Sequence, residues 1–232
     1  MRPDMETIKL INEYSLEFLI LEDMGIELIR NQNGEMIHWF IKDKLQKISK
    51  THSNNLQVGN LLIERLKNCQ AGKKEWATYE NICTDIFEYL FKDNFRKYTY
   101  ENQSCTHDKK LRRDLIINNN FSDSTCFWAK VEKKFDCNLI IVDFKNYTDP
   151  LEQNDFYLPS KYLNLNIGRF AIICSRKGLG DSAKALQQQM FNKNELIICL
   201  DDNDLIGMIK EKMNEQDPTY RLDNLMYAMY KN

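Results

Sequence analysis

The segment LIIVDFKNY, residues 139–147, constrains the fold of this chain more than any other segment. It opens with four apolar residues, three of them β-branched, which is typical of a strand buried on both faces of a sheet. Asp143 and Lys145 then interrupt the apolar run. Side chains two positions apart on a strand project from the same face, so an acid and an ammonium group are expected side by side near the strand end. Taken alone, this motif also fits a solvated ion pair at the end of a strand.

The segments around it alternate between helical and extended patterns. Helices are predicted at residues 76–91, around 159–163, at 181–190 and at 202–212; strands are predicted at residues 98–103, 111–118, 138–147, 170–176 and 196–200. The aromatic and methionine-rich C-terminal segment is expected to form a terminal helix. This order, αβββαβ with a closing helix, predicts an α/β fold: a sandwich around a mixed sheet.

The first third of the chain differs from the rest. Residues 10–66 have a mostly helical pattern, broken near residues 31–34 and 51–55, and contain no recognisable catalytic motif. Gly72 is well placed to end a helix. We therefore expect a helical accessory subdomain at residues 1–72 and a chemistry-bearing domain at residues 73–232.

Composition excludes several classes of protein. The chain has 232 residues, 43% of them hydrophobic and 28% charged, which is typical of a globular domain with a sizeable core. A formal net charge of −2 does not indicate a general nucleic-acid binder, but it is compatible with a locally basic cleft. Seven cysteines without a CxxC pair, and only three histidines, predict reduced thiols and no zinc site. No apolar run reaches the roughly 18 residues of a membrane span, so we expect a cytoplasmic protein with no membrane partner.

Two other acids precede Asp143 and could share a site with it. Asp114 enters a β-branched strand in RRDLIINN, and it converges on Asp143 if the two strands are neighbours. Two such carboxylates repel each other, and a hard cation such as Mg²⁺ relieves that repulsion. Glu80 lies at the margin of the apolar face of helix 76–91, at about 100° per residue, and so faces the sheet. Each acid, taken singly, also fits a solvated side chain.

Together these segments resemble a known family. WATYENICTDIFEYLF, RRDLIINN, IIVDFKNY and GRFAIICSR resemble the PD-(D/E)xK restriction-endonuclease-like superfamily, and look closest to its Mrr-like branch. The resemblance covers about residues 75–212 and implies a restriction-endonuclease-like fold. It assigns the catalytic roles to Glu80, Asp114, Asp143 and Lys145. The chain departs from the pattern in having no proline before Asp114, and Asp in place of the usual Glu at position 143.

The resemblance also implies a chemistry. Asp114 and Asp143 are expected to bind Mg²⁺, for which Mn²⁺ should substitute, with the Phe144 carbonyl completing the metal site. Glu80 is expected either to orient a metal-bound water or to hold a second ion. Such an ion polarises the phosphate and lowers the pKa of bound water, while Lys145 positions the water and stabilises developing charge. The expected activity is that of a metal-dependent endonuclease hydrolysing DNA phosphodiester bonds, as an effector of defence against foreign DNA.

Other residues have weaker claims to contact substrate: Asn146, Tyr147, Arg176 and Arg113. The basic segments 109–113 and 130–134 fit either solvated faces or contacts with a nucleic-acid backbone. The glycine-rich turn at residues 178–180 lacks a P-loop ending, so a plain strand-to-helix connection is predicted there.

Two alternatives to a DNA endonuclease remain open. One is a catalytically silent module that keeps the fold and binds a protein or nucleic-acid partner, and the other is an RNA-directed nuclease. All four expected side chains are present, which favours an enzyme. The sequence also leaves open a regulatory protein partner and a homo-oligomer.

Overall fold

The computed structural model describes residues 54–105 and 112–231. By its internal contacts the chain divides into two units, Met1–Asn55 and Leu56–Asn232, and all the described elements belong to the second except for residues 54–55 at the start of the first helix. The helices and breaks expected before residue 54 lie outside the described residues. A helix at residues 54–68 opens the described part of the chain and is called helix 54–68 below.

A five-stranded mixed sheet in the order β1-β2-β3-β4-β5 forms the centre of this unit. β1 pairs antiparallel with β2 and β2 antiparallel with β3, whereas β3, β4 and β5 run parallel to one another. The predicted α/β class with a mixed sheet is therefore confirmed. The strands are β1 (Tyr100–Cys105), β2 (Arg112–Asn118), β3 (Leu139–Lys145), β4 (Phe170–Ser175) and β5 (Leu196–Leu200).

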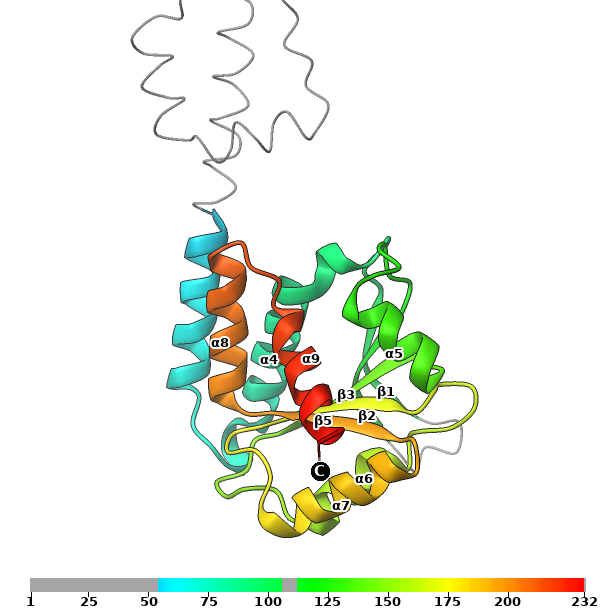
Figure 1. The fold of residues 1–232 in the computed structure, drawn as a ribbon. Helices are drawn as coiled ribbons and strands as arrows, with labels where there is room; N and C mark the ends of the chain where they lie inside the picture. The colour runs from blue at the N-terminus through cyan, green and yellow to red at the C-terminus, as the bar shows by residue number, and fades with distance from the viewer. Residues whose placement is uncertain (1–53, 106–111, 232) are drawn as a thin grey trace, which may run out of the picture. The chain divides into compact units, whose positions relative to one another are not determined.

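Helices cover both faces of the sheet (Figure 1). Helix 54–68 packs on one face together with α4 (Trp76–Phe91), α5 (Phe127–Phe135), α8 (Asp202–Met213) and α9 (Thr219–Met229). The other face is covered by α6 (Gln153–Ser160) and α7 (Asp181–Asn192). Two 3₁₀ turns, η1 (Lys73–Glu75) and η2 (Lys92–Asn94), flank α4.

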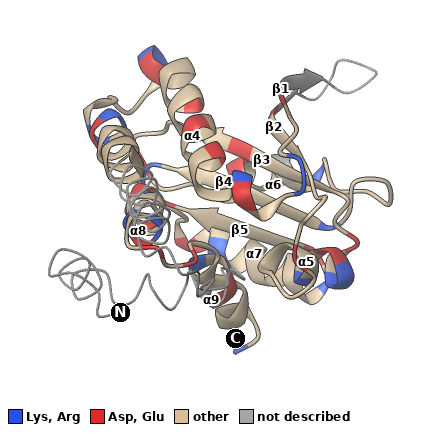
Figure 2. Cartoon of the chain, turned by 90° about the horizontal axis from the view of Figure 1, so that it is seen from above, with Lys and Arg blue, Asp and Glu red and all other residues tan. Residues whose placement is uncertain are grey.

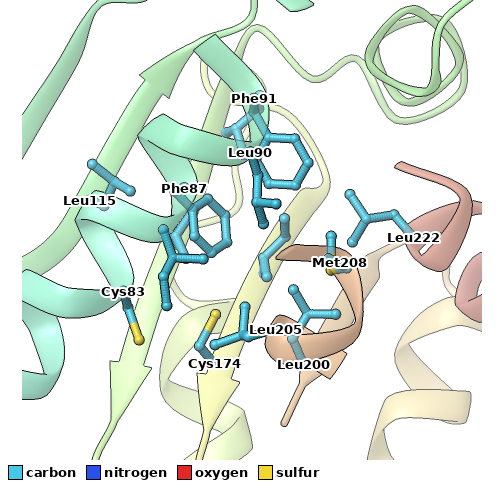
Figure 3. Close-up of a cluster of buried hydrophobic side chains, with 14 of the residues drawn as sticks. Cys83, Phe87, Leu90, Phe91, Leu115, Cys174, Leu200, Leu205, Met208 and Leu222 are labelled. Carbon is cyan, nitrogen blue, oxygen red and sulfur yellow. The ribbon is translucent and has the colours of Figure 1, made fainter. Parts of the chain in front are cut away.

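The larger core lies between the sheet and the α4 side. Figure 3 shows side chains of α4 meeting strand residues such as Leu115 and Cys174 and the α8 residues Leu205 and Met208. Alternate residues of β3 supply Ile140 and Val142 to this core, as the period of two in a strand requires. Helix 54–68 adds Leu62 and Leu66, so the last helix before the predicted boundary at residue 72 packs into the main core.

Most predicted elements have close counterparts in the structure. α4 and β5 have the predicted bounds, and the other strands begin and end within about two residues of them. The terminal helix is present as α9. The helix expected around residues 159–163 instead covers Gln153–Ser160. We did not predict α5, which separates β2 from β3 and carries the basic segment 130–134 on a helix.

The charged residues of both signs are spread over the helices and loops (Figure 2). In the part of the chain that the structure describes, no helix combines the length and apolar character needed to cross a bilayer. All six cysteines with a described side chain are free thiols, and Cys69, Cys83, Cys137 and Cys174 are buried.

Candidate active site

The backbone pairing of β2 with β3 ends at the predicted motif. Their antiparallel register runs from Asn118↔Leu139 to Leu115↔Val142, and one further step would bring Asp114 opposite Asp143. At that step the backbone pairing stops, and the Phe144 N–H donates to Asp114 Oδ2 at 2.8 Å. A side-chain carboxylate thus satisfies a strand N–H that would otherwise lack a partner. Since the N–H and C=O of one strand residue point to the same side, the Phe144 carbonyl also faces the Asp114 edge.

Asp143 and Lys145 form a buried ion pair beside Asp114. Lys145 Nζ lies 2.5 Å from Asp143 Oδ2, and the two side chains are only 13% and 3% exposed. Both project toward the face that carries α6 and α7, because Ile141, two residues earlier on β3, belongs to that core. This geometry confirms the prediction that the Asp143 and Lys145 side chains lie side by side.

Negative charge in this cluster exceeds what Lys145 neutralises. Burial raises the pKa of Asp143 to about 6; Lys145 opposes that shift, and the nearby carboxyl of Asp114 adds to it. Burial lowers the pKa of Lys145, but the charges of Asp143 and Asp114 outweigh burial and bring its pKa above the ordinary value. The Asp114–Asp143 pair is therefore a place where additional positive charge would be favourable.

A pocket of about 650 Å³ joins the four predicted residues. Its lining residues are Gly72, Lys73, Trp76, Glu80, Asp114, Asp143, Phe144, Lys145, Asn146, Tyr147, Thr148, Asp149, Pro150, Glu152, Asp155 and Tyr162. Six of these are acidic and only two, Lys73 and Lys145, are basic. Such a lining favours a bound cation, and without one it would repel a phosphate.

Glu80 reaches this pocket from the first turns of α4, where it is 5% exposed. α4 covers the sheet face opposite α6, so the pocket lies at the edge where β3 ends rather than beneath a single face. Trp76, one helical turn before Glu80, lines the same pocket. Sequence reasoning placed Glu80 at the core margin but overlooked Trp76, although its spacing of four residues put it on the same helix face.

The donor set fits a hydrated divalent ion better than a closed protein cage. Among the described residues, no three His, Cys, Asp or Glu side chains gather closely enough to hold a metal. Asp114 and Asp143 supply two neighbouring carboxylates, and Mg²⁺ is commonly bound by one or two carboxylates while it keeps several waters. Glu80 lines the pocket without completing a three-acid centre.

Asn146 has a role inside the protein that the sequence did not indicate. Its side-chain amide donates to the carbonyls of Gln70 and Gly72, each at 2.9 Å, and its own backbone carbonyl accepts from the Gly72 N–H at 2.8 Å. Residues 69–72, which we call the connector, join helix 54–68 to η1 and α4. Asn146, the residue after Lys145, therefore fastens the connector to the end of β3, and its amide nitrogen is used for that purpose.

Arg176 lies in a different network. Its Nε lies 2.9 Å from Asp202 Oδ2, and its Nη2 donates to the Cys69 carbonyl at 2.8 Å. The guanidinium stacks on Tyr79, whose hydroxyl donates to Asp202 Oδ1 at 3.2 Å. Arg176 does not line the pocket, and its guanidinium holds Asp202 and the connector.

Two further basic segments were candidates for contact with a nucleic-acid backbone. In segment 130–134, Lys130 pairs with Asp223 of α9 at 2.8 Å, and Lys134 contacts Tyr230, the residue that follows α9. Arg113 occupies β2 opposite Ser104, but its side chain lies outside the described residues, as do residues 109–111 of the other basic segment. Tyr147 does line the pocket, and its hydroxyl is close enough to affect the pKa of Lys145.

The glycine-rich turn connects β4 to α7 as expected. Gly178 adopts φ of 70°, and the turn pairs with Leu151 through backbone hydrogen bonds of 2.8 and 2.9 Å. These backbone groups are thus used within the protein.

No family model, curated protein or solved structure matches this chain.

Proposed function

We propose that this chain is a Mg²⁺-dependent endonuclease that hydrolyses DNA phosphodiester bonds and belongs to the PD-(D/E)xK type. One observation carries the proposal: the β2–β3 ladder ends where Asp114 meets the buried Asp143–Lys145 pair, inside a pocket that Glu80 also lines. A purely structural ion pair would not require a second acid, Asp114, beside it. The five-stranded sheet with helices on both faces is compatible with a restriction-endonuclease-like fold. The defence role is proposed from the resemblance alone.

Each residue has a role in this chemistry. Bound Mg²⁺ would supply positive charge to the phosphate and lower the pKa of a coordinated water. Asp114 and Asp143 would hold the ion, with the Phe144 carbonyl facing the same edge. Lys145 would orient the attacking water and stabilise negative charge that develops on the phosphoryl oxygens. Glu80, which does not join the other two acids in one cluster, would hold a water by hydrogen bonding.

The decisive experiment is cleavage by purified protein of supercoiled plasmid and of RNA, in Mg²⁺, Mn²⁺ and EDTA. We expect nicking with either metal and none in EDTA. Asp114→Asn and Asp143→Asn should each lower the rate by about 100-fold or more. Asp181→Asn is the matched control, because Asp181 is a fully exposed acid on α7 that does not line the pocket.

The chief rival is a silent module, favoured by the lack of a three-acid cluster among the described residues. Thermal melts separate the two. A metal-binding protein gains about 2.7 kcal/mol when the free ion is at 100 times Kd. A wild type that melts at one temperature in EDTA and in Mg²⁺, and that nicks nothing, would identify the silent module.

A further inference from the structure

Two large aromatic side chains stand at the mouth of the pocket and have no part in the proposed hydrolysis. Trp76 and Tyr147 both line it, and they remain 47% and 43% exposed. Trp76 comes from the first turn of α4 and Tyr147 from the segment just after β3, so two separate elements each bring an aromatic residue to one opening. Exposed aromatic surface beside a recessed polar site favours ligands with a flat, apolar face.

The charged groups lie deeper than these rings. Asp143 and Lys145 are 3% and 13% exposed, whereas the two aromatics are nearly half exposed. A phosphate must therefore enter the pocket to reach the acids. A phosphate of an intact duplex is attached to a wide, stiff helix whose bases face inward, but an unpaired nucleotide is slender and carries its base with it.

The charge distribution sets the side from which a nucleic-acid backbone could enter. Lys73, exposed at the 3₁₀ turn just before Trp76, is the basic residue near the mouth. Asp149, Glu152 and Asp155 line the side formed by the loop after β3 and the start of α6. Repulsion by these acids favours passage of the anionic backbone along the Lys73 side, next to the Trp76 ring.

We propose that this pocket binds an unpaired nucleotide, with its base stacked on Trp76 and Tyr147 and its phosphate directed toward Asp114 and Asp143. The substrate is then a single-stranded stretch of nucleic acid rather than an intact duplex. A volume of about 650 Å³ lies within the range of small-ligand sites, roughly 300–1,000 Å³. The cleavage part of this inference rests on the proposed function, whereas the stacking part does not.

Binding is tested first, without turnover. Fluorescence anisotropy in Ca²⁺ and in EDTA would compare a labelled single-stranded DNA 12-mer, the RNA of the same sequence, and the DNA duplex. The single strands should bind more tightly than the duplex. Trp76→Ala and Tyr147→Ala should each weaken single-strand binding by about tenfold or more, because a stacked base is lost. Trp76→Phe should retain most of the affinity, since it keeps an aromatic face.

The control is Tyr220→Ala, which removes an aromatic residue on α9, 62% exposed and outside the pocket. It should leave every affinity unchanged. Each variant is first checked for a wild-type melting temperature in EDTA, and Trp76→Phe keeps the test valid if Trp76→Ala folds poorly. Duplex bound as tightly as single strands, or single-strand affinity unaffected by both aromatic substitutions, would overturn the inference.

Cleavage of the same oligonucleotides in Mg²⁺ then distinguishes this inference from the proposed function. Aromatic-dependent single-strand binding without cleavage by wild type in Mg²⁺ or Mn²⁺ would refute the nuclease and retain the nucleotide pocket. Duplex cleavage that is indifferent to Trp76→Ala would retain the nuclease and refute the pocket. Preferential single-strand cleavage, with KM raised and kcat nearly unchanged in Trp76→Ala, supports both.

Discussion

Lys145 and its buried partner Asp143 give the sharpest prediction at the scale of single residues. Lys145 holds the Asp143 carboxylate at 2.5 Å and thus competes with any cation for it. We expect Lys145→Ala to lower single-turnover cleavage by about 100-fold or more, because stabilisation of the transition state is lost. Its Mg²⁺ affinity, measured by calorimetry, should equal or exceed that of wild type.

Two variants serve as references for that measurement. Asp143→Asn should lose both cleavage and Mg²⁺ binding, whereas Lys161→Ala, which removes an exposed lysine on the α6 side, should lose neither. Lys145→Ala cleaving at the wild-type rate would show that the acid-x-lysine motif is a coincidence of sequence.

Asn146 leads to a prediction about stability. Its buried side chain donates to two carbonyls of the connector, so Asn146→Ala should reduce the free energy of unfolding by about 1–3 kcal/mol. Asn146→Asp should cost more at neutral pH, because a carboxylate would face the Gln70 and Gly72 carbonyl oxygens without a donor. Urea unfolding of the three proteins measures the order. If Asp and Ala variants were equally stable, the amide hydrogen bonds would not be what fastens the connector.

The candidate site was partly predictable at this scale. Alternation along a strand placed Asp143 beside Lys145, and helical periodicity put Glu80 at the core margin; the structure has all three in one pocket with Asp114. Asn146 was predicted to contact substrate because it follows the motif directly. Asn146 does line the pocket, but its side-chain amide donates to the carbonyls of residues 70 and 72, and a contact between a side chain and a backbone so distant in sequence leaves no periodic pattern to detect.

At the scale of elements, two glycines make a matched pair of predictions. A Cβ on Gly168 would lie 2.4 Å from the Asp136 carbonyl oxygen, and φ there is 114°, so Gly168→Ala should destabilise by several kcal/mol or prevent folding. Gly207 lies in α8, where an added Cβ would meet nothing within 4 Å, so Gly207→Ala should stabilise by about 0.5–1 kcal/mol. Denaturant unfolding measures both, and equal effects would contradict the tight packing of Gly168 on the chain after α5.

The sequence of α5 and its ends explains why this helix was not predicted. It has only nine residues, no side-chain cap at its start, and Asp136 rather than glycine in the left-handed conformation at its end. The usual start and stop signals are therefore missing. Its apolar face, with Phe127, Val131 and Phe135, is buried against the sheet, so tertiary packing rather than local sequence determines this helix. α4, with sixteen residues and a continuous apolar face, was predicted with its observed bounds.

At the scale of the whole molecule, Asp202 connects several elements and predicts how stability depends on pH. It begins α8, pairs with Arg176 after β4, and accepts from Tyr79 of α4, while Arg176 also holds the connector. Burial raises the pKa of Asp202 to about 6, and Asp201 adds to the shift, although Arg176 and Tyr79 oppose it.

The sign of this effect follows from proton binding. An unfolded aspartate has a pKa of about 3.9, so between about pH 4 and pH 6 the folded state binds more protons at Asp202 than the unfolded state does. The contribution of Asp202 to stability is thus greatest below about pH 4 and declines as pH rises through 6.

Asp202→Asn removes this dependence, whatever constant offset the substitution adds. We therefore expect the melting temperature of wild type, relative to Asp202→Asn, to fall from pH 4 to pH 7. Asp181→Asn, which alters a fully exposed acid on α7, should track wild type throughout. A difference between wild type and Asp202→Asn that stays constant, or that grows in favour of wild type with pH, would show that the charged form of Asp202 is not disfavoured in the fold.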